Sequence, residues 1–282
     1  MGSRCKILLY AESERQAAAA ATAAFDEIAR IETILTDYNP ESESMRVLRK
    51  QPNQWHAISS SLYDMLTESK ALYELSSGAF DPTIGACTHL WRRTTKAGRI
   101  PSDDERAQAL ASSGFNKLIL DPDSHRLMFT TSGMILDFGG IGKGYAADRA
   151  LEVLTRQGIT QAMIDLGGDL VLGDSPPDNP IGWRIDIQTG LTESTTQHIS
   201  NNAIATSGDL EQHFVYQGQR YSHILDPQTA LGITHPIAVT VIAPDATTAD
   251  AIASMISVLG PDWSNTLPDL PATTLVTVVT PD

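Results

Sequence analysis

The chain has 282 residues, 41% of them hydrophobic, so it can bury a substantial core in one large domain or in two closely packed ones. It carries 20 basic and 34 acidic residues, a formal net charge of −14, and this excludes nucleic acid as the main partner because no basic surface would neutralise a phosphate backbone. The two cysteines, Cys5 and Cys87, lie far apart and lack the spacing of a disulfide framework or a zinc site.

No stretch approaches the roughly 20 apolar residues that span a bilayer, so we expect no transmembrane segment. The first residues, MGSRCKILLYAES, contain no apolar signal core followed by a cleavage site. As given, the chain is expected in the cytoplasm, and in the periplasm if an export signal has been removed from it.

The hydrophobic spacing predicts helices and strands that interleave along the chain. In chain order we predict strand 5–11, helices 15–35, 42–49, 60–77 and 101–112, strands 117–120 and 126–129, helix 145–157, strands 162–166, 183–188, 203–206, 212–216 and 237–243, helix 247–259 and strand 275–279. The elements do not follow a regular βαβ spacing. The sequence therefore predicts an α+β fold with mixed sheets and flanking helices, in a single large domain over residues 1–282.

A glycine-rich segment, ILDFGGIGKGY (135–145), runs from a strand into a helix. Such a junction can present backbone N–H groups and a positive helix end to a phosphate. It is not a standard nucleotide loop: a P-loop would need glycine at Asp137 and a hydroxyl residue at Gly144, and the dinucleotide pattern would need glycine at Tyr145. Two interpretations remain, an anion site and a tight connection without a ligand.

Two further sites have both a functional and an ordinary interpretation. Asp250 and Ser254 stand four residues apart on a predicted helix, where they could bind a hard cation together or act as capping partners. We expect Asp250 to be partly exposed, so that Asp250→Ala leaves the fold intact. His223 lies in an apolar segment, YSHILDP, as a core histidine or as a catalyst.

Six motifs follow one another along the chain: GAFDPTIG (78–85), LDFGGIGKGYAAD (136–148), IDLGGD (164–169), ATSGD (205–209), YSHILDPQT (221–229) and ADAIAS (249–254). In this order they resemble the ApbE family of FAD:protein FMN transferases, which implies a T-fold-like architecture. The resemblance spans nearly the whole chain. It implies an enzyme that binds FAD, uses Mg²⁺ or Mn²⁺, transfers FMN to a threonine or serine of an acceptor flavoprotein, and releases AMP.

The resemblance also implies roles for individual residues. Flavin contacts fall on Met1, Tyr38, Ala79, Phe80, Asp81, Asp137, Lys143 and His223, and metal ligands on Asp250, Ser254 and the carbonyl of Gly140. His223 is the expected general base or positioning group, and Lys143 is expected to place a positive charge on the phosphate oxygens.

The sequence departs from the family pattern at two positions that affect these expectations. Ser254 replaces the usual threonine and keeps the hydroxyl oxygen. Ala230 stands where the family has glycine, so that either Ala230 adopts a strained positive φ or Gly232 takes over the turn. Two alternative functions stay open: a Mg²⁺-dependent FAD pyrophosphatase that yields FMN and AMP, and a protein that binds FAD without catalysis.

Overall fold

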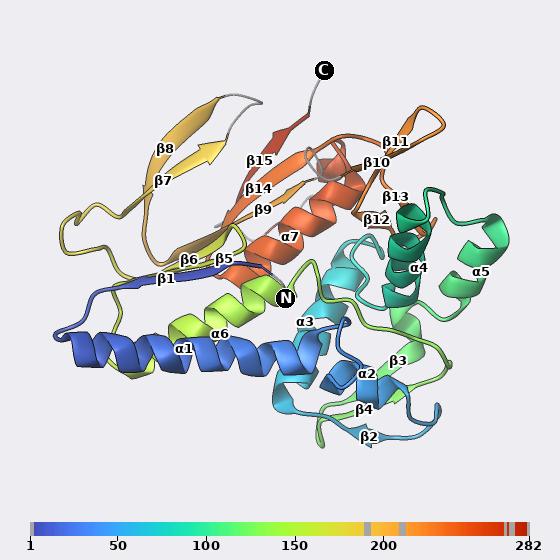
Figure 1. Ribbon diagram of the computed structural model, residues 1–282, viewed down its shortest axis with the longest axis horizontal. Coiled ribbons are helices and arrows are strands. Elements are labelled where there is room, and N and C mark those ends of the chain that lie inside the picture. Colours follow the sequence, from blue (N-terminus) through green and yellow to red (C-terminus); the bar gives the residue numbers. More distant parts are fainter. Residues whose placement is uncertain (1–2, 189–192, 209–212, 268–269, 271–273, 281–282) are drawn as a thin grey trace.

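The computed structural model describes residues 3–188, 193–208, 213–267, 270 and 274–280. Seven α-helices and two short 3₁₀ helices lie in these residues (Figure 1). The helices are α1 (Glu14–Leu35), α2 (Glu43–Leu48), α3 (Ser60–Leu75), α4 (Gly85–Lys96), α5 (Asp103–Ala111), η1 (Phe115–Lys117), α6 (Gly142–Arg156), α7 (Ala246–Leu259) and η2 (Trp263–Asn265).

The strands form one long sheet and four small ones within the described residues. They are β1 (Cys5–Leu9), β2 (His56–Ala57), β3 (Leu118–Asp121), β4 (Arg126–Phe129), β5 (Ala162–Leu166), β6 (Asp169–Leu172), β7 (Trp183–Gln188), β8 (Ser194–Ile199), β9 (Asn202–Gly208), β10 (His213–Tyr216), β11 (Gln219–Ser222), β12 (Leu225–Asp226), β13 (Leu231–Gly232), β14 (Ala238–Ala243) and β15 (Leu275–Val279).

The long sheet has six strands in the order β1-β5-β6-β9-β14-β15. Every ladder described is antiparallel, and the parallel pairing among these residues is the isolated bridge between Ile84 and Ile135. Side chains alternate between the two faces, so that Ile164 of β5 and Val171 of β6 are buried as cross-strand partners. The predicted α+β class, with sheets and flanking helices, is confirmed. The expected mixed pairing is not, because the ladders within the described residues are antiparallel.

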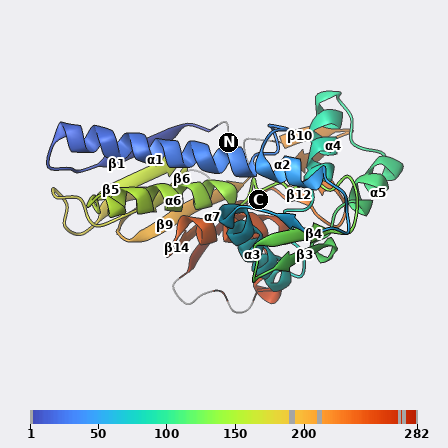
Figure 2. The same cartoon turned by 90° about the horizontal axis from the view of Figure 1, so that it is seen from below.

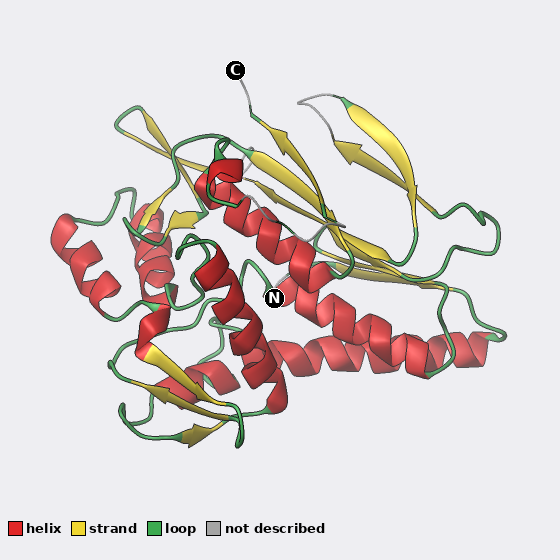
Figure 3. Ribbon diagram, turned by 180° about the vertical axis from the view of Figure 1, so that it is seen from behind, coloured by secondary structure: helices red, strands yellow, loops and turns green. Residues whose placement is uncertain are grey.

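Helices α1, α6 and α7 form a layer beside this sheet, with α1 and α6 side by side (Figures 1 and 2). The contact face of α1 carries small and apolar residues at helical spacing, and Ala20, Ala24 and Ile31 have no exposed surface. Alanine lets the two helices approach closely. Figure 3 shows the helices of this layer running alongside the strands of the long sheet.

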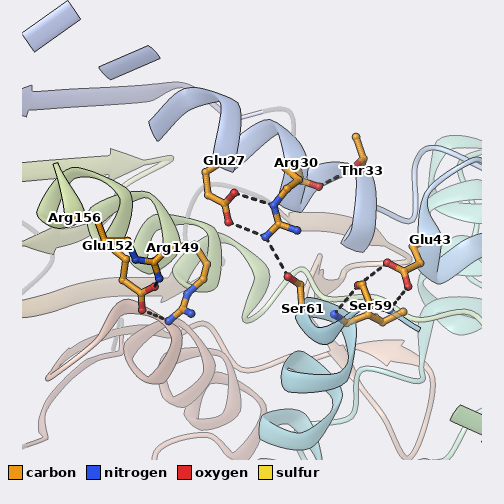
Figure 4. Close-up of polar contacts among 10 residues, drawn as sticks. Glu27, Arg30, Thr33, Glu43, Ser59, Ser61, Arg149, Glu152 and Arg156 are labelled. Carbon is orange, nitrogen blue, oxygen red and sulfur yellow. Dashed lines mark hydrogen bonds and ion pairs between the residues drawn. The ribbon is translucent and has the colours of Figure 1, made fainter. Parts of the chain in front are cut away.

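Polar contacts join the ends of α1 and α2 to α3, as Figure 4 shows. Arg30 of α1 pairs with Glu27 at 2.7 Å and donates a hydrogen bond to Ser61 Oγ of α3 at 3.1 Å. Glu43 of α2 accepts bonds from the backbone amide and the hydroxyl of Ser59, each 2.6 Å long. Because Ser59 is the N-cap of α3, this carboxylate fixes where α3 begins relative to α2.

The observed elements differ from the sequence prediction in three places that matter for the site. Strand β6, which begins at Asp169, is absent from the predicted strands. Helix α6 begins at Gly142, three residues before the predicted start, so that part of the glycine segment forms its first turn. Helix α4 was not predicted, because its N-cap is Ile84, which has no capping side chain, and its exposed side is rich in threonine and basic residues. The other predicted helices and strands lie within two residues of the observed ones.

Candidate functional site

Residues 137–144 lead from the isolated β-bridge at Ile135 into the first turn of helix α6. Most of their backbone amides donate hydrogen bonds to other groups of the protein. Gly139 N donates to Asp137 Oδ1 at 2.9 Å, Gly142 N donates to the carbonyl of Phe138 at 2.7 Å, and Gly144 N donates to Asp250 Oδ2 at 3.2 Å. These amides are not free for a phosphate. Of the two interpretations of the glycine segment, the tight connection describes these amides. Lys143 and a bound cation are the further groups of this segment that could attract an anion.

Helices α6 and α7 cap each other at this connection. Asp250 of α7 accepts the Gly144 amide in the first turn of α6, while Asp148 of α6 accepts the amides of Ala246 and Thr247 at 2.9 and 2.8 Å. The backbones are in contact here, since a Cβ added to Gly144 would lie 2.0 Å from the carbonyl oxygen of Ala246. Asp250 is therefore fixed relative to the loop.

Lys143 lies between two buried carboxylates. Its ammonium pairs closely with Asp169 of β6 and lies 3.1 Å from Asp250 Oδ1, and Asp169 and Asp250 are 2% and 3% exposed. Burial would lower the pKa of Lys143, but the charges of Asp250 and Asp169 outweigh it and hold that pKa above its usual value. Lys143 is thus a fixed positive charge and not a proton acceptor.

Asp169 is the residue of this group whose neutral, protonated form is favoured by its surroundings. Burial, together with the charge of Asp250, raises the pKa of Asp169 to about 7 in spite of its ion pair with Lys143. The sequence contained Asp169 in the motif IDLGGD, but its contact with Lys143 depends on the β5–β6 hairpin, which places β6 beside α6.

The three expected metal-binding residues lie around the same connection. A Cβ on Gly140 would lie 2.8 Å from Ser254 Oγ, so that only a glycine lets the loop backbone approach the hydroxyl this closely. Asp250 lies one helical turn before Ser254 on α7. A carboxylate, a hydroxyl and a backbone carbonyl are the oxygen donors that Mg²⁺ prefers, so these residues fit the ion. The described residues contain no group of three or more His, Cys, Asp or Glu side chains suited to a metal.

One expectation about Asp250 is wrong. Asp250 is buried, not partly exposed, because α6 packs directly against it. Its capping interpretation holds for α6, while Asp245 is the N-cap of α7, the helix of Asp250, and accepts the Thr248 amide at 2.7 Å. Removing the Asp250 carboxylate therefore affects the fold as well as the site.

The other end of the connection carries an aromatic and charged group that includes two expected residues, Tyr38 and Asp137. The Arg92 guanidinium lies 4.5 Å from the centroid of the Tyr38 ring, 2.5 Å from Asp37 Oδ2 and 3.3 Å from Asp137 Oδ2. His89 Nε2 lies 2.9 Å from the same oxygen of Asp37. Arg92 and His89 are not among the predicted site residues, because the sequence pattern did not predict helix α4.

The corner at residues 79–81 lies beside the metal-binding residues through its aromatic side chain. Phe80 is 7% exposed, and its Cε2 atom would be 3.6 Å from a Cβ on Gly140. Asp81 accepts the amide and the hydroxyl of Thr83 at 2.8 and 2.7 Å, and burial raises its pKa. Asp81 therefore shapes the corner, and Ala79, 9% exposed, packs within it.

His223 is not a core histidine. It is exposed in a bend between β11 and β12, and the preceding Tyr221 packs on Trp91 of α4 with ring centroids 5.8 Å apart. Met1 lies outside the described residues. Ser3, the first of them, contacts Gly167, where an added Cβ would lie 2.8 Å from Ser3 Cβ and 3.8 Å from Lys143 Cδ. The start of the described chain thus lies beside Lys143.

The turn after β12 contains Ala230, where the resemblance implies glycine. Ala230 adopts φ +55° and is 1% exposed, so the strained alternative is the observed one. Gly232 lies in strand β13 and not in the turn. Ala230 belongs to a buried apolar cluster with Cys87 and Trp91.

A cavity of about 1030 Å³ lies away from these residues. Its walls come from α3, from the opposite side of α6 and from the start of α7, and they include Glu68, Asp148 and Arg149. Arg149 and Arg156 both pair with Glu152 on this side of α6 (Figure 4). None of the expected site residues lines this cavity.

An α+β fold with a lysine held by two buried aspartates at a glycine-rich helix start defines a class, and comparison with known proteins identifies it. The sequence profile of the ApbE family matches residues 1–274, and the chain belongs to that family. FAD:protein FMN transferase of Treponema pallidum is 29% identical over 281 residues, covering 92% of this chain and 77% of that protein. Its counterpart in Escherichia coli K12 is 30% identical over 242 residues, covering 81% and 68%.

Solved structures agree with this assignment. The ApbE protein of Thermotoga maritima is 31% identical, with a TM-score of 0.84 over 98% of this chain and 90% of that one. A mutant of the flavin transferase ApbE from Vibrio cholerae is 26% identical, with a TM-score of 0.86 over 100% and 92%. The chain is therefore an enzyme of the transferase class. None of the described helices is long and apolar enough to cross a membrane.

Proposed function

We propose that this enzyme transfers the FMN portion of FAD to the hydroxyl group of a threonine or serine in an acceptor flavoprotein and releases AMP, with Mg²⁺, or Mn²⁺ in its place, held by Asp250, Ser254 and the Gly140 carbonyl. The observation that carries the proposal is the position of Lys143. A charged ammonium held by Asp169 and Asp250 lies beside the oxygen donors for a cation, at the start of a helix.

This arrangement suits a pyrophosphate substrate. The whole chain is strongly acidic, so a doubly charged anion is attracted only where positive charge is fixed locally. Lys143 supplies such a charge at neutral pH, because its pKa is raised. When bound, Mg²⁺ would neutralise charge on the phosphate oxygens as the bond to the leaving group breaks.

Different residues around the connection suit different parts of the substrate. Tyr38 and Asp137, which Arg92 joins, lie at one end of residues 137–144, and Lys143 lies at the other. An exposed aromatic ring suits a planar ring system, and an ammonium suits phosphate. We therefore place the flavin toward Tyr38 and the pyrophosphate toward Lys143.

The transfer step forms one bond and breaks one. The acceptor hydroxyl oxygen attacks the phosphorus on the FMN side of the pyrophosphate, and the bond from that phosphorus to the bridging oxygen breaks. AMP leaves with the bridging oxygen, and the hydroxyl proton moves to His223. An exposed histidine in a bend is accessible to a hydroxyl presented by another protein, which supports a role as general base.

The acceptor is a separate protein, since this chain carries no convincing copy of the Gly-Ala-Thr-like segment expected around a modified residue. The products distinguish the proposal from its two alternatives. With FAD and Mg²⁺, a transferase releases AMP in proportion to the acceptor added, a pyrophosphatase releases AMP and FMN equally without any acceptor, and a protein that only binds FAD releases neither. Chromatography of the soluble products after incubation with and without an acceptor domain measures this directly. Acceptor-independent AMP release at the full rate would overturn the proposal.

A further inference from the structure

Arg92 of α4 connects two segments that are far apart in the sequence. Asp37 and Tyr38 follow the end of α1, and Asp137 begins the glycine-rich connection. The guanidinium contacts Asp37 through Nη1 at 2.5 Å, Asp137 through Nη2 at 3.3 Å, and the Tyr38 ring through its face. A planar group with separate donors can make these three contacts together, and an ammonium cannot.

Arg92 is itself held in a fixed position. Asp37 is 8% exposed and accepts bonds from both Arg92 and His89, which lie three residues apart on one face of α4. Burial alone would raise the pKa of Asp37, but the bond from His89 and the charge of Arg92 outweigh it, and that pKa lies below its usual value. Asp37 therefore stays ionised at neutral pH and anchors the guanidinium.

The Tyr38 ring remains largely accessible although Arg92 lies over it. The residue is 73% exposed, so most of its surface can receive a planar ligand. An exposed tyrosine on a surface normally samples several rotamers, and a stacked guanidinium favours one of them. The contact with Arg92 thus favours one orientation of the Tyr38 ring.

We infer that Arg92 is a positioning residue that fixes the Tyr38 ring and the Asp137 carboxylate relative to each other, and that it thereby sets the affinity of the site for the flavin half of the substrate and not for the adenosine half. This inference rests on the proposed function, which places the flavin toward Tyr38. Arg92 acts through its two neighbours and takes no part in the transfer step.

Equilibrium titration with two halves of the substrate tests the inference. Arg92→Met removes the three contacts while it keeps a long apolar side chain. It should weaken FMN binding about tenfold, because the Tyr38 ring loses its cation–π contact and Asp137 loses its charged hydrogen bond. Binding of ADP should change by less than about twofold. Arg93→Met, at the exposed neighbouring position on the same helix, is the matched control and should bind both ligands like the wild type.

A second pair of variants separates positioning from general stability. In a Tyr38→Leu background, Arg92→Met should cause little further loss of FMN affinity, because the residue acts through the ring. Arg92→Lys keeps the charge but not the geometry and should recover only part of the affinity. If Arg92→Met does not fold, Arg92→Lys with the same two ligands decides the question.

The outcomes separate this inference from the proposed function. Unchanged FMN affinity in Arg92→Met or Arg92→Lys, or an equal loss for ADP and FMN, would overturn the inference. A wild-type protein that binds neither FMN nor ADP would instead overturn the proposed function, and the positioning role with it.

Discussion

Asp250 Oδ2 accepts a hydrogen bond from the Gly144 amide, 3.2 Å away, so that a side chain of α7 completes the first turn of α6. The same carboxylate contacts Lys143 through its other oxygen. One residue thus serves the fold and the site at once. Substitutions at Asp250 must be chosen so that these two roles can be measured separately.

Asp250→Asn and Asp250→Ala provide that separation. Alanine leaves the buried Gly144 amide without this acceptor, which should lower the free energy of unfolding by about 1–3 kcal/mol. Asparagine keeps an oxygen at the position and should lose less. Urea denaturation with and without MgCl₂ measures both effects, since Mg²⁺ should stabilise the wild type by mass action and neither variant. Equal stability of the two variants would show that the contact with Gly144 contributes nothing.

Two glycines in the first turn of α6 should respond to alanine in opposite ways. A Cβ at Gly144 would lie 2.0 Å from the Ala246 carbonyl oxygen, so Gly144→Ala must separate α6 from α7 and should cost at least about 1–3 kcal/mol. A Cβ at Gly142 would meet Phe138 and Leu35 at 3.4 and 3.7 Å, which is ordinary contact. Gly142→Ala should therefore stabilise the protein by about 0.4–1 kcal/mol. Thermal unfolding of the two variants beside the wild type checks the sign of each change.

The stability of the protein should depend on pH through Asp148. Burial raises the pKa of Asp148 from 3.8 to about 6, in spite of the bonds that it accepts from Thr247 and from the Ala246 amide. The folded state therefore binds this proton more tightly than the unfolded state. The resulting stabilisation is complete below about pH 4 and is lost as the pH rises through about 6.

The difference in unfolding free energy between the wild type and Asp148→Asn isolates this effect from other carboxylates. As the pH rises from 4 to 6, the wild type should lose stability relative to Asp148→Asn. Asp26→Asn, at an exposed position of α1, is the control and should show no such change. A constant difference between wild type and Asp148→Asn over this range would contradict the assignment.

His223→Ala tests the proposed path of the proton. If the imidazole accepts the proton of the acceptor hydroxyl, the transfer rate should fall by roughly 10²–10⁴ while FAD affinity changes little. The rise of the wild-type transfer rate with pH that comes from deprotonation of a general base should be absent from the variant. A rise that persists in His223→Ala would assign the proton to another group.

Much of the fold could be predicted because its helices and strands have regular hydrophobic spacing. The long helix α1 carries Ala20, Ala24 and Ile31 on one face, and strands β1 and β5 of the long sheet alternate in burial. The pair Asp250 and Ser254 could be predicted as neighbours for the same reason, since residues four apart share a helix face.

The rest of the site depends on contacts that spacing does not reveal. Helix α4 has an apolar face formed by Cys87, Leu90, Trp91 and Thr94, and this spacing was the signal that could have located it. Its other residues are polar, and no side chain caps its start. Arg92 and His89 were missed with it, and Asp169 acquires its role only when β6 comes to lie beside Lys143.

The most direct test of the proposed transfer is the mass of the acceptor. The enzyme, FAD and Mg²⁺ are incubated with an acceptor domain that carries an exposed Gly-Ala-Thr segment, and the intact protein and its peptides are weighed by mass spectrometry. One threonine or serine of the acceptor should gain the mass of FMN less one water, with one AMP released for each modified acceptor. An acceptor of unchanged mass, with free FMN and AMP in solution, would contradict the proposed transfer and identify the enzyme as a pyrophosphatase.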